Sequence, residues 1–113
     1  MAFEKLIFAA YSCRNFYQRF RISKYIIEQG QIPINPFLLE DYDLAGLVEH
    51  ERIRELNNSL AKRCDELWIF GDIADGVVRE EKIFLELKKP VYYFSLSHEG
   101  EINKTERSKL RRE

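Results

Sequence analysis

The sequence predicts a single α/β domain with a four-stranded, mainly parallel sheet flanked by helices. Short apolar runs alternate along the chain with helix-sized amphipathic segments. Within the apolar runs there is no alternation with polar residues, which is typical of parallel strands covered on both faces. The chain has 113 residues, a length that supports one hydrophobic core and leaves little room for a second.

Each expected strand is a short run bounded by loop residues. The runs are residues 5–10 (KLIFAA), 31–36 (QIPINP), 66–70 (ELWIF) and 90–94 (PVYYF). Pro33 has no backbone N–H, so the second run is expected near an edge of the sheet. Because crossovers between parallel strands are right-handed, the expected order in the sheet is 2-1-3-4.

Helical spacing of apolar residues indicates the elements between the strands. The expected helices are residues 14–30, 49–64 and 76–88. The first has Phe16, Phe20 and Ile27 near one face, and Gly30 stands where a helix often ends. Residues 37–48 fit either a loop or a turn of helix.

The domain is expected to span residues 1–95. Residues 96–113 form a charged C-terminal tail with little apolar content, for which we expect a solvated helix or a disordered segment. The basic end of this tail (KLRR) is more typical of a solvated chain end than of a nucleic-acid contact.

Charge and cysteine content favour a cytoplasmic protein. A net charge of −1 gives no reason to expect nucleic acid or an anionic membrane as partner. No apolar run is long enough to span a bilayer, and the opening segment is too short for a secretory signal. Cys13 and Cys64 indicate free thiols in a reducing compartment. His50 and His98 lack a metal partner at helical or turn spacing, so we expect both on the surface, with no metal and no cofactor.

The expected topology locates a ligand site before any motif is considered. In doubly wound sheets, ligands bind outside the carboxyl ends of the strands, near the point where the strand order reverses. The residues expected at that edge are Tyr11, Ser12, Asn35, Gly71, Asp72 and the loop 74–76 (ADG).

The third expected helix carries a carboxylate among its apolar residues. At about 100° per residue, Glu80 falls between Val77 and Phe84, while Glu81 lies at the edge of the apolar stripe. Burying an unpaired carboxylate is unfavourable, so a chain normally keeps one inside only with partners or for a task.

Three explanations of Glu80 stay open. The acid can be favoured by the helix dipole in the first turns, with its carboxylate in water. It can also belong to an ion pair or hydrogen-bond network of structural value only. The functional explanation is a carboxylate at the floor of the cleft, acting as nucleophile or base beside a sugar ring.

Four runs of the sequence carry a family resemblance: QIPINP, CDELWIFG, ADGVVREE and KKPVYYF. Together they are similar to the nucleoside 2-deoxyribosyltransferase-like superfamily, in particular its small bacterial and phage members. The similarity spans residues 5–94 and is most specific over 64–94. It implies a Rossmann-like or flavodoxin-like fold, assembly as a homodimer or larger homo-oligomer, and a small-molecule nucleoside or nucleotide as the ligand.

The resemblance also implies residue roles. The family places its nucleophilic glutamate in a glycine-x-x-x-glutamate setting, which Gly76 and Glu80 match. A polar residue after the first strand positions that carboxylate, and Tyr11 stands nearest to this position. The loop after the second strand helps to form the pocket, which implicates Asn35. The family often has a small residue shortly after the nucleophile, where this chain has Phe84.

The expected reaction is hydrolysis or transfer at the N-glycosidic bond of a nucleoside or nucleoside 5′-monophosphate, by double displacement through Glu80. In sequence, Asp72 and Asp75 are the nearest candidates to protonate the leaving base. Ser12, Asn35, Gly71, Asp72 and Gly76 are expected to bind substrate. The alternative is a non-catalytic module that binds or senses a nucleotide-derived ligand through the same cleft.

Overall fold

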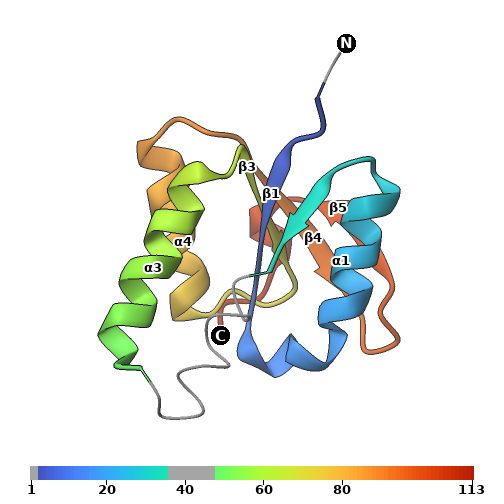
Figure 1. Ribbon diagram of the computed structural model, residues 1–113. Helices are drawn as coiled ribbons and strands as arrows, with labels where there is room; N and C mark the ends of the chain where they lie inside the picture. The colour runs from blue at the N-terminus through green and yellow to red at the C-terminus, as the bar shows by residue number, and fades with distance from the viewer. Residues whose placement is uncertain (1–2, 36–47) are drawn as a thin grey trace.

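The computed structural model describes residues 3–35 and 48–113, and it is an α/β domain with one five-stranded sheet (Figure 1). The strands are β1 (Leu6–Tyr11), β2 (Ile32–Ile34), β3 (Glu66–Phe70), β4 (Val91–Leu96) and β5 (Ile102–Thr105). The α-helices are α1 (Arg19–Glu28), α3 (His50–Arg63) and α4 (Asp75–Glu86), and the 3₁₀-helices are η1 (Cys13–Gln18) and η2 (Arg107–Lys109). The ambiguous segment 37–48 lies, apart from its last residue, outside the described residues.

The strand order is β2-β1-β3-β4-β5, which confirms the order predicted for the first four strands. β1 pairs in parallel with β2 and β3, and β3 pairs in parallel with β4. In this register Tyr11 lies opposite Phe70, and Phe70 lies opposite Phe94, so the carboxyl ends of the three strands meet at one edge. Pro33 lies in β2, an edge strand, as its missing N–H predicts.

Helix α1 covers one face of the sheet, and α3 and α4 cover the other (Figure 1). Successive residues of β1 and β3 point into opposite cores, which explains why their sequences are apolar without alternation. The core under α1 contains Ile7, Ala9, Tyr11, Ile22, Ile26, Trp68, Phe70 and Phe94. The core under α3 and α4 contains Phe8, Ala10, Ala61, Cys64, Leu67, Ile69, Ile73, Val77 and Phe84.

The predicted number of strands was wrong, because the C-terminal segment contributes β5. This strand pairs antiparallel with β4 from Tyr93↔Thr105 to Leu96↔Ile102, so residues 102–105 are neither a solvated helix nor disordered. A tight turn connects the two strands, in which Gly100 has φ +83° and donates its N–H to the carbonyl of Ser97. As a short edge strand, β5 needs little apolar content beyond Ile102, which packs against the α1 core.

The predicted apolar face of the segment 14–30 was wrong for Phe20 and Ile27, whereas Phe16 is partly buried against the core under α1. Phe20 and Ile27 are exposed, whereas Ile22 and Ile26 are buried against the sheet. The segment begins as the 3₁₀-helix η1, whose three residues per turn change the angular positions of the residues that follow. The predicted end is confirmed, because Gly30 follows α1 with φ +84°.

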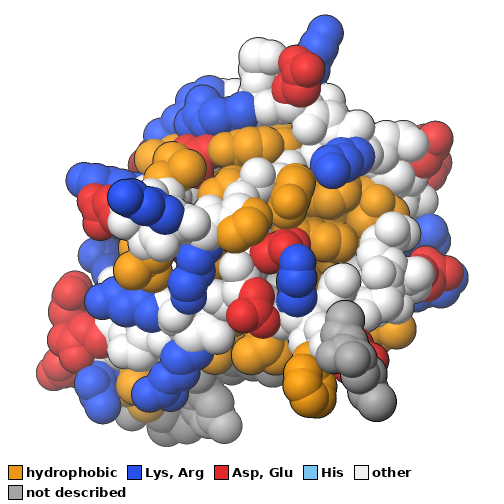
Figure 2. Space-filling view, turned by 90° about the horizontal axis from the view of Figure 1, so that it is seen from above, with side chains coloured by type: hydrophobic (Ala, Val, Ile, Leu, Met, Phe, Trp, Pro, Cys, Tyr) orange, Lys and Arg blue, Asp and Glu red, His pale blue; other side chains and the backbone are white. Residues whose placement is uncertain are grey.

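Charged side chains of both signs are mixed over the surface in Figure 2, with apolar side chains visible between them. This distribution agrees with the small net charge of the chain. No helix within the described residues has the length and apolar character needed to cross a membrane.

Candidate functional site

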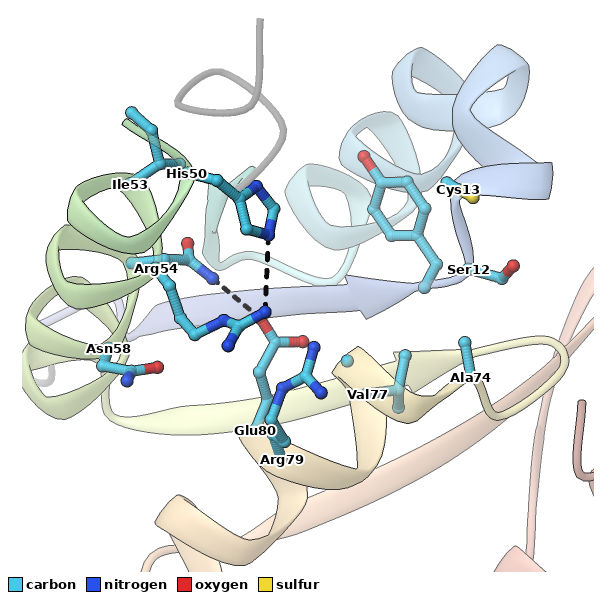
Figure 3. A pocket seen from close by; sticks show the side chains of 13 residues that line it. Ser12, Cys13, His50, Ile53, Arg54, Asn58, Ala74, Val77, Arg79 and Glu80 are labelled. Carbon is cyan, nitrogen blue, oxygen red and sulfur yellow. Dashed lines mark hydrogen bonds between the residues drawn. The ribbon is translucent and has the colours of Figure 1, made fainter. Parts of the chain in front are cut away.

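A cavity of about 290 Å³ opens at the carboxyl edge of the sheet, between α3 and the first turns of α4 (Figure 3). This volume is close to the lower end of the usual range for small-molecule pockets, about 300–1,000 Å³. The end of β1 supplies Tyr11, Ser12 and Cys13. Helix α3 supplies His50, Ile53, Arg54, Asn57 and Asn58, and the α4 side supplies Ala74, Gly76, Val77, Arg79 and Glu80.

Glu80 projects from α4 toward α3 and lines this cavity (Figure 3). Its side chain is half-buried, and Asn57 Nδ2 donates a hydrogen bond to Glu80 Oε2 at 3.1 Å. The carboxylate therefore lies at the ligand-binding edge that the topology predicts, and it is held there by a neutral donor from the facing helix.

Tyr11 ends β1 and is almost completely buried, and it also lines the cavity. Its hydroxyl donates to Asn35 Oδ1 at 2.8 Å, so the residues after β1 and β2 meet as expected. Ser12 is buried beside Tyr11, and its Oγ accepts from the N–H of Arg14 at the start of η1. The structure thus brings Tyr11, Ser12, Gly76 and Glu80 around one cavity, and Asn35 does not line it but accepts the hydrogen bond of Tyr11.

Among the described residues that line the cavity, the two arginines Arg54 and Arg79 outnumber the one carboxylate, Glu80. Arg54 Nη2 lies 3.4 Å from His50 Nε2, one helical turn away (Figure 3). Arg79 folds back along α4, with Nη2 3.7 Å from where a Cβ at Gly76 would be. A Cβ at position 76 would therefore be in ordinary van der Waals contact with the Arg79 guanidinium.

Gly71 and Asp72 do not line this cavity. They belong to a separate hollow of about 130 Å³ at the same edge of the sheet, together with Asn15, Tyr17, Leu96, Ser97 and His98. Gly71 has φ +75° and follows β3 directly, so the chain turns at this point.

Asp75 does not line the cavity either. It is exposed at the start of α4 and forms an ion pair with Arg112. The hydrogen bond and the charge of Arg112 hold the pKa of Asp75 below its usual value. Asp75 is therefore ionised at neutral pH and has no proton to donate to a leaving base.

The buried carboxylate of α4 is Glu81 rather than Glu80. Glu81 is 6% exposed and accepts hydrogen bonds from Arg107 and Tyr93. Burial raises its pKa, but the hydrogen bonds and the charge of Arg107 lower it by more, so the pKa lies below its usual value. Burial and the hydrogen bond to Glu81 raise the pKa of Tyr93 to about 12.

The sequence-based search missed the contribution of α3. His50, Arg54, Asn57 and Asn58 follow one another at helical spacing, on the polar side of that helix. A polar stripe of this kind is usually a solvated face, so its spacing alone does not indicate a site. Within residues 3–35 and 48–113, no group of three or more His, Cys, Asp or Glu side chains is arranged to hold a metal ion.

Comparison with known proteins found no protein-family model and no curated protein that matches the chain. The expected family, activity and self-association therefore stay predictions from the sequence.

Proposed function

We propose that this protein breaks the N-glycosidic bond of a nucleoside or nucleoside 5′-monophosphate, as a hydrolase or a deoxyribosyltransferase, with Glu80 as nucleophile. The observation that supports the proposal is the position of Glu80, whose carboxylate lines a cavity at the carboxyl edge of the sheet together with Tyr11. A nucleophilic carboxylate must be able to approach the anomeric carbon from inside a substrate pocket.

The proposed reaction proceeds by double displacement. A carboxylate oxygen of Glu80 forms a bond to the anomeric carbon while the bond from that carbon to the base nitrogen breaks, and its electron pair leaves with the base. The resulting glycosyl ester is then cleaved by water in a hydrolase, or by a second base in a transferase. The negative charge of Glu80 also stabilises the positive charge that develops on the sugar.

The leaving base needs a proton, and the structure gives His50 a better position than either aspartate. His50 lines the cavity, whereas Asp72 and Asp75 lie outside it. Histidine is the side chain that most often transfers protons in enzymes near neutral pH. The Arg54 guanidinium can only donate, so His50 Nε2 accepts in this contact. To act as a general acid, His50 must carry a proton on both ring nitrogens, so the contact with Arg54 has to open before Nε2 takes up the second proton. We assign His50 as the proton donor in this proposal.

The charge of the cavity favours the 5′-monophosphate over the uncharged nucleoside. Arg54 and Arg79 both line the cavity, and guanidinium groups bind phosphate oxygens through paired donors. The exposed ion pair of Arg54 Nη1 with Glu51, at 3.7 Å, is weak enough for a phosphate to compete with it.

The test is release of free base, measured by chromatography, from a panel of deoxynucleosides and their 5′-monophosphates. We expect release by the parent protein and loss of release in Glu80→Gln. Glu86→Gln is the matched control, because it makes the same change at an exposed acid of the same helix. No release from any member of the panel, or release that persists in Glu80→Gln, contradicts the proposal.

One observation favours the second candidate, a non-catalytic module that binds a nucleotide-derived ligand. Neither aspartate expected to protonate the base lies in the cavity, and a binding protein needs no proton donor. For this candidate we expect the 5′-monophosphates to raise the melting temperature without releasing base. The same panel therefore distinguishes the two functions.

A further inference from the structure

The contact between Asn57 and Glu80 joins helices α3 and α4 beside the cavity. Asn57 Nδ2 donates to Glu80 Oε2 at 3.1 Å. Asn57 Oδ1 is buried and has no hydrogen-bond partner among the described residues. The amide nitrogen of Asn57 thus binds Glu80, and the amide oxygen has no hydrogen-bond donor among the described residues.

The orientation of the amide follows from its chemistry. If the side chain were turned over, the carbonyl oxygen would point at the Glu80 carboxylate, and two acceptors would repel each other. The orientation with the amide nitrogen toward Glu80 is therefore favoured, even though it leaves Oδ1 buried without a donor.

A buried acceptor without a partner is unfavourable for folding. An apolar residue at position 57 would remove this penalty, since Asn57 is partly buried beside Ile53 and other residues that line the cavity. Residues that lower the stability of the folded state in this way are typical of functional sites, where the side-chain geometry that function requires is kept despite its cost in stability.

From this combination we infer that Asn57 is a positioning residue for Glu80: it fixes the carboxylate at the cavity wall and favours its ionised form. The inference rests on the proposed function, because it gives Asn57 a role in a reaction that Glu80 performs. A donor to a carboxylate stabilises the charged form. Losing that donor should therefore make Glu80 easier to protonate and less precisely oriented for attack.

The decisive measurement is independent of any substrate. Glutamate side chains are labelled with ¹³C at the carboxyl carbon, and the Glu80 signal is assigned by its absence in Glu80→Gln. We expect its titration midpoint to rise in Asn57→Ala and to rise further in Asn57→Asp, where a second carboxylate repels the first. Asn58→Ala is the matched control, because it truncates the neighbouring asparagine of α3, for which no hydrogen bond to Glu80 is present in the described residues.

Kinetics and melting temperature complete the test. With the panel substrate that gives the fastest base release, kcat should fall about tenfold in Asn57→Ala, the loss expected for one charge-assisted hydrogen bond, while KM changes less than twofold. The melting temperature should stay within about 2 °C of the parent value or increase, because the buried unsatisfied acceptor is removed with the donor.

A Glu80 midpoint that stays at its parent value in Asn57→Ala, or moves equally in Asn58→Ala, overturns the inference. A large fall in melting temperature with an unchanged Glu80 signal also overturns it and assigns Asn57 a structural role. If the parent protein releases no base, the proposed function fails, and the carboxyl titration alone decides whether Asn57 positions Glu80.

Discussion

Arg107 donates from Nε and Nη2 to the two carboxylate oxygens of Glu81, at 2.8 and 3.1 Å, and so ties the segment after β5 to helix α4. Tyr93 from β4 donates to the same carboxylate at 2.5 Å. Helix α4, strand β4 and the segment after β5 therefore meet at one buried charge. This arrangement holds the C-terminal segment against the helix that carries Glu80.

Arg107→Ala should lower the free energy of unfolding by about 2 kcal/mol, because it leaves Glu81 buried without a cation. The value lies below that for a fully buried pair, since the Arg107 side chain is 51% exposed. Urea unfolding measures the change. Arg52→Ala is the control: it removes an exposed arginine that pairs with Glu55 and should change stability by less than about 0.5 kcal/mol. Equal losses in the free energy of unfolding for the two variants would show that the Arg107–Glu81 pair stabilises the fold no more than an exposed ion pair does.

Stability should depend on pH through Glu81. Its pKa in the folded protein lies below the ordinary value of 4.5. The folded state therefore binds this proton less readily than the unfolded state, and the stabilisation is fully present above about pH 4.5. It is lost as the pH falls through the folded-state pKa. The difference in melting temperature between the parent and Glu81→Gln should be largest near neutral pH and should narrow toward pH 3. Parallel curves from pH 3 to 7 would contradict this assignment.

Tyr11→Phe should lower kcat for base release about tenfold, because the ring can no longer be fixed by its hydrogen bond to Asn35. The stability of the variant should fall by about 1 kcal/mol, the usual net value of such a bond. Tyr17→Phe is the control, since Tyr17 lines the separate hollow and not the main cavity. Steady-state kinetics and thermal unfolding measure the two effects. An equal kcat in Tyr11→Phe and Tyr17→Phe would show that the Tyr11 hydroxyl has no role in catalysis.

Arg54→Ala and Arg79→Ala should each raise KM for a 5′-monophosphate about tenfold and leave KM for the matching nucleoside nearly unchanged. The reason is that both guanidinium groups line the cavity and would bind phosphate. Arg63→Ala, at the far end of α3, serves as the control. A KM that rises equally for nucleoside and nucleotide would contradict a role in phosphate binding.

Cys13 and Cys64 should differ sharply in their reaction with a thiol reagent. Cys13 is exposed and lines the cavity, whereas Cys64 is buried and burial raises its pKa to about 11. Because the thiolate is the reactive form, one thiol per chain should react in the folded protein and two in denaturant. A bound 5′-monophosphate should slow the labelling of Cys13. Fast reaction of both thiols in the folded protein would contradict the burial of Cys64.

The sequence predicted Glu80 at the cleft and Glu81 at the edge of the apolar stripe, but it did not show that Glu81 is the more deeply buried of the two acids. At about 100° per residue, Glu80 and Glu81 lie at similar angles on opposite sides of the ridge formed by Val77 and Phe84. The elements packed against α4 give the two carboxylates different environments, since Glu81 faces Arg107 and Tyr93, while Glu80 faces α3. Phe84 is fully buried and does not reach the cavity.

The central strands were predictable because strands buried on both faces leave a continuous apolar signal in the sequence. β5 left a weaker signal, although Gly100 between two short runs is typical of a hairpin turn. The meeting of Tyr11 and Asn35 followed from the strand order. The presence of Arg54 and Asn57 in the cavity lining did not follow from the strand order, because it depends on how α3 packs against α4.

The chain has a single tryptophan, Trp68, so tryptophan fluorescence reports on one known place in the fold. The indole packs on Phe94 with ring centroids 5.0 Å apart and donates to Glu66 at 3.0 Å, on the face of the sheet that α1 covers. Emission from Trp68 should therefore follow loss of the α1 layer during denaturation. It should respond little to a ligand that enters between α3 and α4, so occupancy of that side requires a separate reporter.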